Sequence, residues 1–216
     1  MFSFKIFNIR VRVEWWFWRT LAFIGGGLTA NDADSIMRVL LFMGAGFLSI
    51  LIHELGHALM IRRYGYQTEI VLIAFGGYAT CPVGAFTRKQ DFLVTLAGPL
   101  VQFAAGVGVW FLLQSGIAGS SSQLLHLLNS FFLVSIVWAI FNCFPIMPMD
   151  GGKMLLALVG PRFEKAVYIT GIVCALTLGF LGLAYLKTFL LPIFMGLFAY
   201  QNWQLLQQAG SGRRFS

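Results

Sequence analysis

The chain has very little charge for its length. Lys, Arg, Asp and Glu make up 11% of its 216 residues, whereas 58% of the residues are apolar. A typical soluble domain carries about a quarter charged residues. So much apolar surface needs lipid around it, and the length leaves no room for a large domain outside the membrane. The composition excludes an ordinary soluble protein and predicts a polytopic membrane protein.

Paired cysteines and a continuous basic surface are also lacking. Cys81, Cys143 and Cys174 are an odd number with no close pair, so they indicate neither a disulfide framework nor a cysteine zinc site. The net charge of +7 comes from short cationic clusters between apolar runs. Such clusters are typical of loops held on the cytoplasmic side of a bilayer, and we expect no nucleic-acid partner.

Long apolar runs fill most of the chain. A helix needs about 20 apolar residues to cross a bilayer. Six runs are expected to do so: residues 15–30, 36–61, 92–113, 124–144, 167–186 and 189–206. With the N-terminus in the cytoplasm, thirteen of the fifteen Lys and Arg residues fall on the inner side, including Arg213 and Arg214. We therefore expect a multi-pass protein of the cell or inner membrane with both termini in the cytoplasm.

Two further segments carry the pattern of strands. Residues 9–14 alternate between apolar and polar side chains, which favours a retained strand over a secretory signal cleaved after Ala30. Residues 68–82 are rich in Ile, Val, Phe and Tyr around Gly76-Gly77, which predicts a β-hairpin at the cytoplasmic mouth of the bundle. The predicted fold class is an all-α polytopic membrane protein with about six transmembrane helices and a small sheet, made of the β-hairpin and the N-terminal strand, at the cytoplasmic face. We expect one domain over residues 1–216 with a catalytic core at about 36–165.

The second expected span contains the motif HExxH, formed by His53-Glu54-Leu55-Gly56-His57. Residues four apart lie on the same face of a helix, so both imidazoles can bind one metal ion, with Glu54 near a water bound to that ion. The alternative is a set of polar residues that pack a helix interface. Ionisable side chains inside a span are costly unless they serve a site, which favours the metal site.

Catalytic zinc usually has three protein ligands, so a third is needed. No third His follows at the HExxHxxGxxH spacing, and His126 lies about 24 Å from the inner end of its span. Glu69 at the start of the hairpin is expected to be solvated. Asp150 lies at that inner end, after Pro145 and Pro148 and before two glycines that allow a tight turn. An aspartate that only shapes this turn is the alternative.

Together these elements resemble the site-2 protease family of intramembrane zinc metalloproteases. About 90 residues after HExxH comes the pattern NxxPxxPxDGG, which runs from Asn142 to Gly152. Phe75-Gly76-Gly77 resembles the glycine-bearing hairpin strand of that family, and Ala97-Gly98-Pro99 resembles an element of its third span. The similarity covers the chain from about Phe4 to Lys165. Gln102 stands where an Asn is common, which puts a supporting hydrogen bond in question.

The resemblance implies one zinc ion per chain and peptide-bond hydrolysis in or near transmembrane segments of membrane-tethered proteins. The expected partners are a transmembrane protein substrate and the lipid bilayer. Without an inserted PDZ domain or a CBS pair, the sequence resembles a minimal member. The expected site residues are the ligands His53, His57 and Asp150, the catalytic base Glu54, the carbonyl-positioning Asn142, and the substrate-binding Phe75, Gly76 and Gly77.

Other functions remain open at this point. A prenyl-protein-processing metalloprotease needs a downstream Glu ligand, and the Asp-Gly-Gly element speaks against it. A metal-binding transporter or a catalytically inactive scaffold belongs to a different class. Transporters often place their sites near the bilayer midplane, whereas His57 is five residues from Arg62 and so lies near one face.

Overall fold

The computed structural model describes residues 1–82, 84–116, 119, 121–185, 187 and 189–210. The chain forms two compact units, each described below by itself. Unit 1 comprises Met1–Ala85 and Ala97–Ile140, and unit 2 comprises Phe86–Leu96 and Phe141–Ser216. The predicted cytoplasmic cations Arg213 and Arg214 lie outside the described residues.

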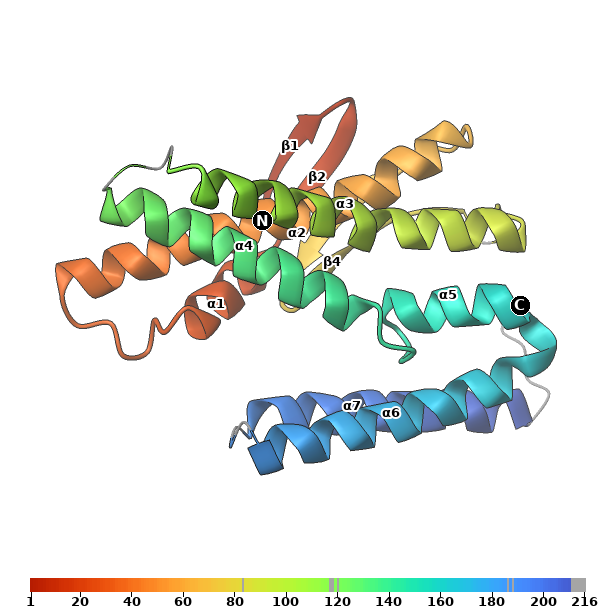
Figure 1. The fold of residues 1–216 in the computed structure, drawn as a ribbon. Coiled ribbons are helices and arrows are strands. Elements are labelled where there is room, and N and C mark those ends of the chain that lie inside the picture. Colours follow the sequence, from red (N-terminus) through yellow and green to blue (C-terminus); the bar gives the residue numbers. More distant parts are fainter. Residues whose placement is uncertain (83, 117–118, 120, 186, 188, 211–216) are drawn as a thin grey trace. The chain divides into compact units, whose positions relative to one another are not determined.

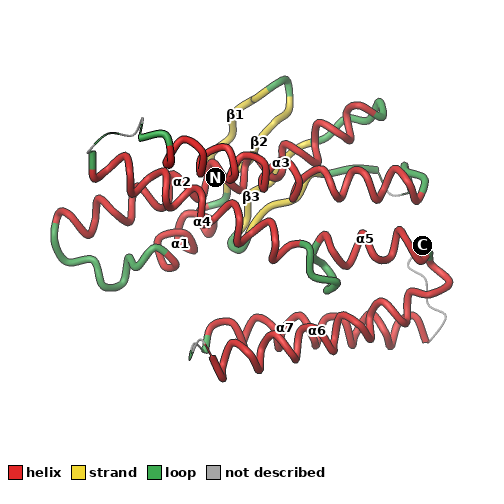
Figure 2. The backbone as a smooth tube through the Cα atoms, viewed as in Figure 1, coloured by secondary structure: helices red, strands yellow, loops and turns green. Residues whose placement is uncertain are grey.

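Unit 1 holds a four-stranded sheet in the order β1-β2-β3-β4, drawn yellow in Figure 2. The strands are β1 Phe2–Ile6, β2 Ile9–Val13, β3 Glu69–Ile73 and β4 Gly76–Ala79. β2 buries alternate side chains, Ile9, Val11 and Val13, as its sequence pattern predicted, and it pairs parallel with β3. β3 pairs antiparallel with β4, which confirms the predicted hairpin. β1 extends the sheet beyond the two segments that the sequence indicated.

The helices of unit 1 start with α1 (Trp15–Ile24) and α2 (Ala33–Arg63). α1 ends where Gly25-Gly26-Gly27 follows, with Gly26 at φ +87°, a conformation that favours glycine. α2 begins at a capping box, in which Asp32 accepts from the Ser35 N–H and the Ser35 hydroxyl contacts the Asp32 N–H. α3 (Arg88–Gln114) and α4 (Ser122–Asn142) are continuous helices with most of their residues in this unit.

Unit 2 contains α5 (Asp150–Val159), a short 3-10 turn (Pro161–Phe163), α6 (Glu164–Tyr185) and α7 (Leu190–Gly210). α6 and α7 run side by side along their length (Figure 1). Their core buries Ala175 and Met195 against Ile146 and Met149 of the segment that precedes α5. α5 is a helix that the sequence did not indicate, because Gly151 and Gly152 in its first turn have low helix propensity.

The prediction of six spans is confirmed in part. Within the described residues, four stretches are long and apolar enough to cross a membrane: α2, α3, α4 and Pro161–Tyr185. α1 has ten residues, about 15 Å of helix, which is short of the roughly 30 Å hydrocarbon core. α7 has 21 residues, but Gln and Asn residues in its second half lower its hydropathy. The chain is a mostly helical integral membrane protein.

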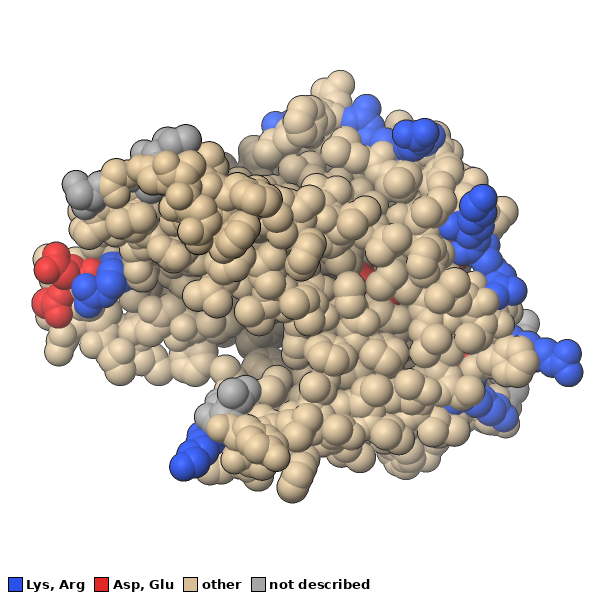
Figure 3. Space-filling model, viewed as in Figure 1, with Lys and Arg blue, Asp and Glu red and all other residues tan. Residues whose placement is uncertain are grey.

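Charge is absent from the middle of the long helices of unit 1. In Figure 3 charged side chains gather near the start of α2, at the left of the view, and the surface over the middle of α3 and α4 is uncharged. Apolar side chains cover that surface, and Leu100, Phe111 and Leu133 are each more than half exposed. Exposed apolar side chains over helices of this length and hydropathy are typical of a membrane-facing surface.

Candidate metal centre

The centre of unit 1 is the HExxH motif in α2. His53 and His57 lie one helical turn apart and are buried, with exposed fractions of 3% and 8%. Their Nε2 atoms approach to 3.0 Å, and the two rings meet edge to face. Two imidazole nitrogens that converge on one point in a buried position are the arrangement that a shared metal ion requires. The predicted pairing of the two histidines on one helix face is confirmed.

A chain of buried hydrogen bonds holds His53 in place. Its Nδ1 lies 2.9 Å from Gln102 Oε1, and Gln102 Nε2 donates to Ser49 Oγ at 2.9 Å. Ser49 in turn contacts the Ser135 hydroxyl at 2.8 Å. With the Gln102 oxygen as acceptor, Nδ1 of His53 carries the proton and Nε2 presents its lone pair. Gln102 therefore supplies the supporting hydrogen bond that its departure from Asn had put in question.

Two glycines let α3 approach the motif closely. A Cβ atom added at Gly56 would lie 2.6 Å from the Ala97 carbonyl oxygen, and one added at Gly98 would collide with the His57 ring. The element Ala97-Gly98-Pro99 therefore lies directly against the ligand helix. Its small residues are needed for contact between the helices, as the small residues of membrane helix interfaces generally are.

Glu54 is buried next to strand β4. Its side chain is 3% exposed, and a Cβ atom added at Gly77 would lie 2.9 Å from Glu54 Cγ and 3.0 Å from Glu54 Oε1. The backbone of β4 thus passes beside the carboxylate. In the described sheet β4 pairs only with β3, so its other edge faces away from the sheet. Phe75, Gly76 and Gly77, predicted to bind substrate, lie at the start of this edge strand.

Two other candidate ligands are engaged elsewhere. His126 Nε2 lies 3.2 Å from the carbonyl oxygen of Arg38, near the start of α2 and about 22 Å along the helix from His53. Glu69 is not merely solvated, because its carboxylate pairs with Arg12 at 3.2 Å across β2 and β3. Neither side chain belongs to the centre.

In unit 2, Asp150 is the first residue of α5. Its side chain is buried, and Lys153 one turn later lies 3.4 Å from Oδ1. The helix N-terminus and this ammonium group both stabilise the ionised carboxylate. Asn142, predicted to position the reacting carbonyl, is the last residue of α4 and is partly buried.

The glycines after Asp150 do not form the tight turn that the sequence suggested. Both lie inside α5, and added Cβ atoms would collide with backbone: at Gly151 with the carbonyls of Cys143 and Phe144, at Gly152 with Ile146 and Met147. Their role is to let the first turn of α5 pack against the segment that follows α4. Asp150 therefore begins a helix and does not precede a turn.

Asn202 in α7 supports the same segment and was missed by the sequence reasoning. It is fully buried, its Nδ2 donates to the Met147 carbonyl at 2.8 Å, and its Oδ1 accepts from the Met147 N–H at 3.3 Å. Gly171 of α6 leaves room for it, since a Cβ there would collide with the amide. The sequence carried no clear signal for this role, because Asn202 lies among several Gln residues in the second half of α7.

The donor set of the two motifs fits zinc. Imidazole nitrogen and carboxylate oxygen are both zinc ligands, and the second ring nitrogen of His53 has the hydrogen-bonded partner typical of such sites. Cysteine is a poor candidate here. Burial and the neighbouring Asp150 carboxylate both raise the pKa of the Cys143 thiol, which keeps it in its protonated form.

Comparison with known proteins agrees with this chemistry. A family model described as peptidase family M50 matches residues 41–118 and 114–184. A zinc metalloprotease of Methanocaldococcus jannaschii is 31% identical over 161 residues, which cover 74% of this chain and 45% of the relative. Stage IV sporulation protein FB of Bacillus subtilis is 31% identical over 144 residues, which cover 65% of this chain and 46% of the relative. The chain thus spans about half the length of these relatives.

A solved structure is also similar. The site-2 protease from Methanocaldococcus jannaschii matches with a TM-score of 0.63 and 27% identity, over 93% of this chain and 95% of that one. The likeness therefore covers the sheet and the helices as well as the two motifs. Since the family model also covers more than half of the sequence, the chain belongs to peptidase family M50, the site-2 protease family.

Proposed function

We propose that this protein is an intramembrane zinc metalloprotease that hydrolyses peptide bonds in or near transmembrane segments of membrane-tethered proteins. One observation carries the proposal. Among the described Asp, Glu, His, Lys and Arg residues, four are buried, and these are His53, Glu54, His57 and Asp150. Burying such groups in an apolar protein is costly unless a site uses them. All four belong to the two motifs that match the family.

One zinc ion per chain is proposed, with His53, His57 and Asp150 as its ligands. The proposal is supported by the convergent Nε2 atoms of the histidines and by the burial of Asp150 beside Lys153. Two relatives are named as zinc metalloproteases. When bound, zinc supplies Lewis acidity that polarises a peptide carbonyl and makes water a nucleophile near neutral pH.

The residues of the chain divide the remaining work. Glu54 accepts the proton of the attacking water and passes it to the leaving amine. Gln102 keeps the His53 ring in one tautomer and one orientation. Asn142 is proposed to hold the reacting carbonyl through its amide. The catalytic core is proposed to lie at about residues 36–165.

The open edge of β4 is proposed to bind the substrate as an added strand. A transmembrane helix has its peptide carbonyls internally bonded, so it must unwind before attack. Pairing with β4 replaces those lost hydrogen bonds and brings the unwound segment beside Glu54. Replacing Gly77 with proline should stop cleavage while metal content stays unchanged, because Glu54 and β4 are not ligands. Loss of metal in that variant would contradict this role.

The expected topology also remains a proposal. The cationic clusters support a topology with the two termini and the sheet on the cytoplasmic side. The close packing of α7 against α6 supports α7 as a further span. The proposed partners are a transmembrane protein substrate and the surrounding lipid.

The deciding experiment compares the wild-type protein with Glu54→Gln in liposomes that contain a single-span reporter. Both proteins should bind about one zinc per chain, and only the wild-type protein should cleave the reporter. A transporter would move zinc and leave the reporter intact, and a scaffold would tolerate the substitution. Cleavage by Glu54→Gln at the wild-type rate would overturn the proposal.

A further inference from the structure

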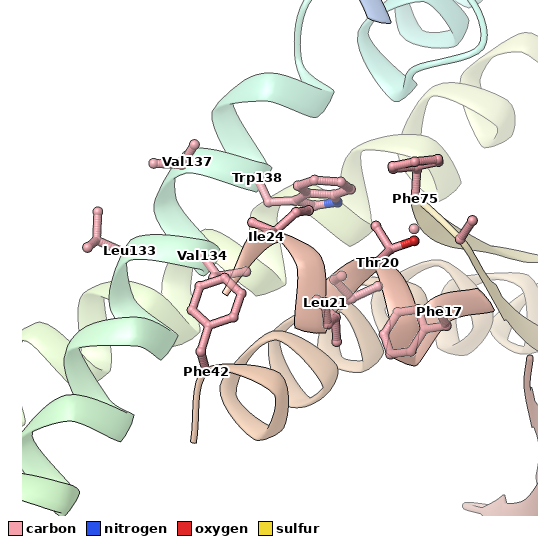
Figure 4. A pocket seen from close by; sticks show the side chains of 13 residues that line it. Phe17, Thr20, Leu21, Ile24, Phe42, Phe75, Leu133, Val134, Val137 and Trp138 are labelled. Atoms are coloured by element: carbon pink, nitrogen blue, oxygen red, sulfur yellow. The ribbon is translucent and has the colours of Figure 1, made fainter. Parts of the chain in front are cut away.

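Unit 1 contains an apolar pocket on the far side of β4 from Glu54. Its volume is about 310 Å³, and it lies between α1, α2, α4 and the turn that joins β3 to β4. Figure 4 shows Trp138 and Val134 reaching in from α4, Leu21 and Ile24 from α1, and Phe75 from the turn. Thr20 is the polar side chain of the lining, and its hydroxyl bonds to the Trp16 carbonyl of its own helix. The pocket therefore offers apolar contacts only.

The backbone of β4 relates this pocket to the proposed active site. A Cβ atom at Gly77 would point at Glu54, whereas one at Gly76 would point at Trp138, 3.5 Å from Cζ2. Neighbouring residues of a strand point to opposite faces of the sheet. At this point, one face of β4 therefore lies against the Glu54 carboxylate, and the other face lies against the pocket.

A strand added beside β4 must follow the same alternation. In such a strand, one substrate residue has its backbone beside Glu54. The next substrate residue directs its side chain toward Trp138. We propose that the pocket receives the side chain of this substrate residue, so that it selects a large apolar residue directly beside the cleaved bond. This inference rests on the proposed protease function and on strand addition to β4.

Size and location both suit such a side chain. A cavity of about 150 Å³ is enough to bind benzene, so about 310 Å³ accommodates a Leu, Met or Phe side chain with its neighbouring backbone. Leu133 and Val137, at the pocket rim, are exposed by 58% and 56% on the surface of α4 that lipid covers. The pocket therefore opens toward lipid, and a substrate residue from a transmembrane segment is already surrounded by lipid.

The test uses the zinc-loaded full chain in liposomes with single-span reporters. The cleaved bond is first mapped by mass spectrometry, and the residues on each side of it are then replaced in turn by Ala, Leu, Phe and Lys. At one of these positions, Leu and Phe should raise kcat/KM over Ala by about tenfold to a hundredfold, and Lys should lower it. Equal rates for all four residues at every position would overturn the inference and leave the proposed function intact.

Two pocket variants link the preference to this site. Val134→Phe fills the pocket and should lower the Phe-to-Ala ratio of kcat/KM by about tenfold, whereas Trp138→Ala enlarges it and should raise the relative rate of a Trp-bearing reporter. Ile140→Phe, on the exposed face of α4 outside the lining, serves as the matched control and should keep the wild-type ratio. Zinc content is measured in each variant to show that the centre is assembled.

The outcomes separate the two proposals. Zinc-loaded wild-type protein that cleaves no reporter contradicts the proposed function itself. If the reporter is cleaved but the Phe-to-Ala ratio of kcat/KM is the same in both pocket variants as in the wild type, only the pocket assignment is contradicted. If the Phe-to-Ala ratio of kcat/KM is unchanged in both pocket variants but changes with the acyl-chain length of the lipid, the pocket binds lipid. This outcome also overturns the inference.

Discussion

The two halves of the proposed metal centre are built in different ways. The HExxH half lies in the C-terminal half of α2, a helix of 31 residues, and its histidines share a face because of helix periodicity alone. The Asp150 half lies at the first residue of α5, a helix of 10 residues that begins after an irregular segment. There no local periodicity places the carboxylate, and packing must do so.

The two halves are also held in place by different interactions. The histidines are supported from α3 and α4 through Gln102, Ser49 and Ser135. The segment before Asp150 is supported by glycines without side chains and by one amide, Asn202, from α7. A ligand pair on a regular helix needs help with orientation, whereas a ligand after a loop needs help with position.

The largest effect is expected when the proposed ligand Asp150 is removed. Asp150→Ala should remove both zinc and proteolysis, because two imidazoles alone leave the ion short of its usual three protein ligands. Metal analysis of the purified protein and reporter cleavage check this. Asp34→Ala, at a matched first-turn position of α2, should change neither. Full activity in Asp150→Ala would remove Asp150 as a ligand.

A single methyl group should disturb the HExxH half. Gly98→Ala places a Cβ against the His57 ring, so zinc content and cleavage should fall strongly. Gly108→Ala in the same helix, where an added Cβ meets no atom within 4 Å, should retain both and stabilise the helix slightly. Equal behaviour of the two variants would show that the close approach at Gly98 does not constrain the ligand.

Removing the amide that supports the Asp150 half should have an intermediate effect. Asn202→Leu leaves the partly buried N–H and carbonyl of Met147 without this partner, at a cost of up to about 1–3 kcal/mol. Thermal unfolding should occur at a lower temperature, and zinc affinity should fall with it. Asn129→Leu, an exposed amide that bonds within its own helix, is the control. An unchanged unfolding temperature in Asn202→Leu would contradict the supporting role.

The hydrogen bond by which Gln102 fixes the tautomer of His53 should affect the affinity for zinc. Gln102→Leu removes the acceptor for the His53 Nδ1–H and should weaken zinc binding by about 10–100-fold with little change of fold. Competition with a chelator measures the affinity, and circular dichroism reports the helix content. Gln114→Leu on the exposed end of α3 should bind zinc as the wild-type protein does. Unaltered affinity in Gln102→Leu would show that Gln102 only fills space.

The smallest effect is expected far from either half, at the start of α2. The Ser35 backbone N–H lowers the pKa of Asp32, so the cap is charged and present near neutral pH. Because the folded-state pKa is depressed, this contribution to stability is lost as the pH falls through it. Asp32→Ala should slightly lower the unfolding temperature at neutral pH, and the difference from wild type should vanish in acid. A difference that persists unchanged in acid would contradict the cap.

Much of this site followed from sequence, for identifiable reasons. His53, Glu54 and His57 were predicted because helix spacing is local, and the β3–β4 hairpin because strand-forming residues flank two glycines. The expected first span was wrong in its helical extent, since three glycines end α1 at Ile24. The reason given for Gly151 and Gly152 was wrong as well, because helix packing and not a turn requires them.

By itself, the sequence determined the lipid environment, the pair of histidines with its glutamate, and the family. Each of these depends on composition or on short motifs that can be recognised in the sequence without knowing which residues pack together. Only the tertiary structure decided that Gln102 orients His53, that Asn202 holds Met147, and that β4 passes beside Glu54 with a pocket behind it. Ser49 meets Ser135 across 86 residues and Asn202 meets Met147 across 55, and contacts so distant in the chain are set by packing, which no local pattern encodes.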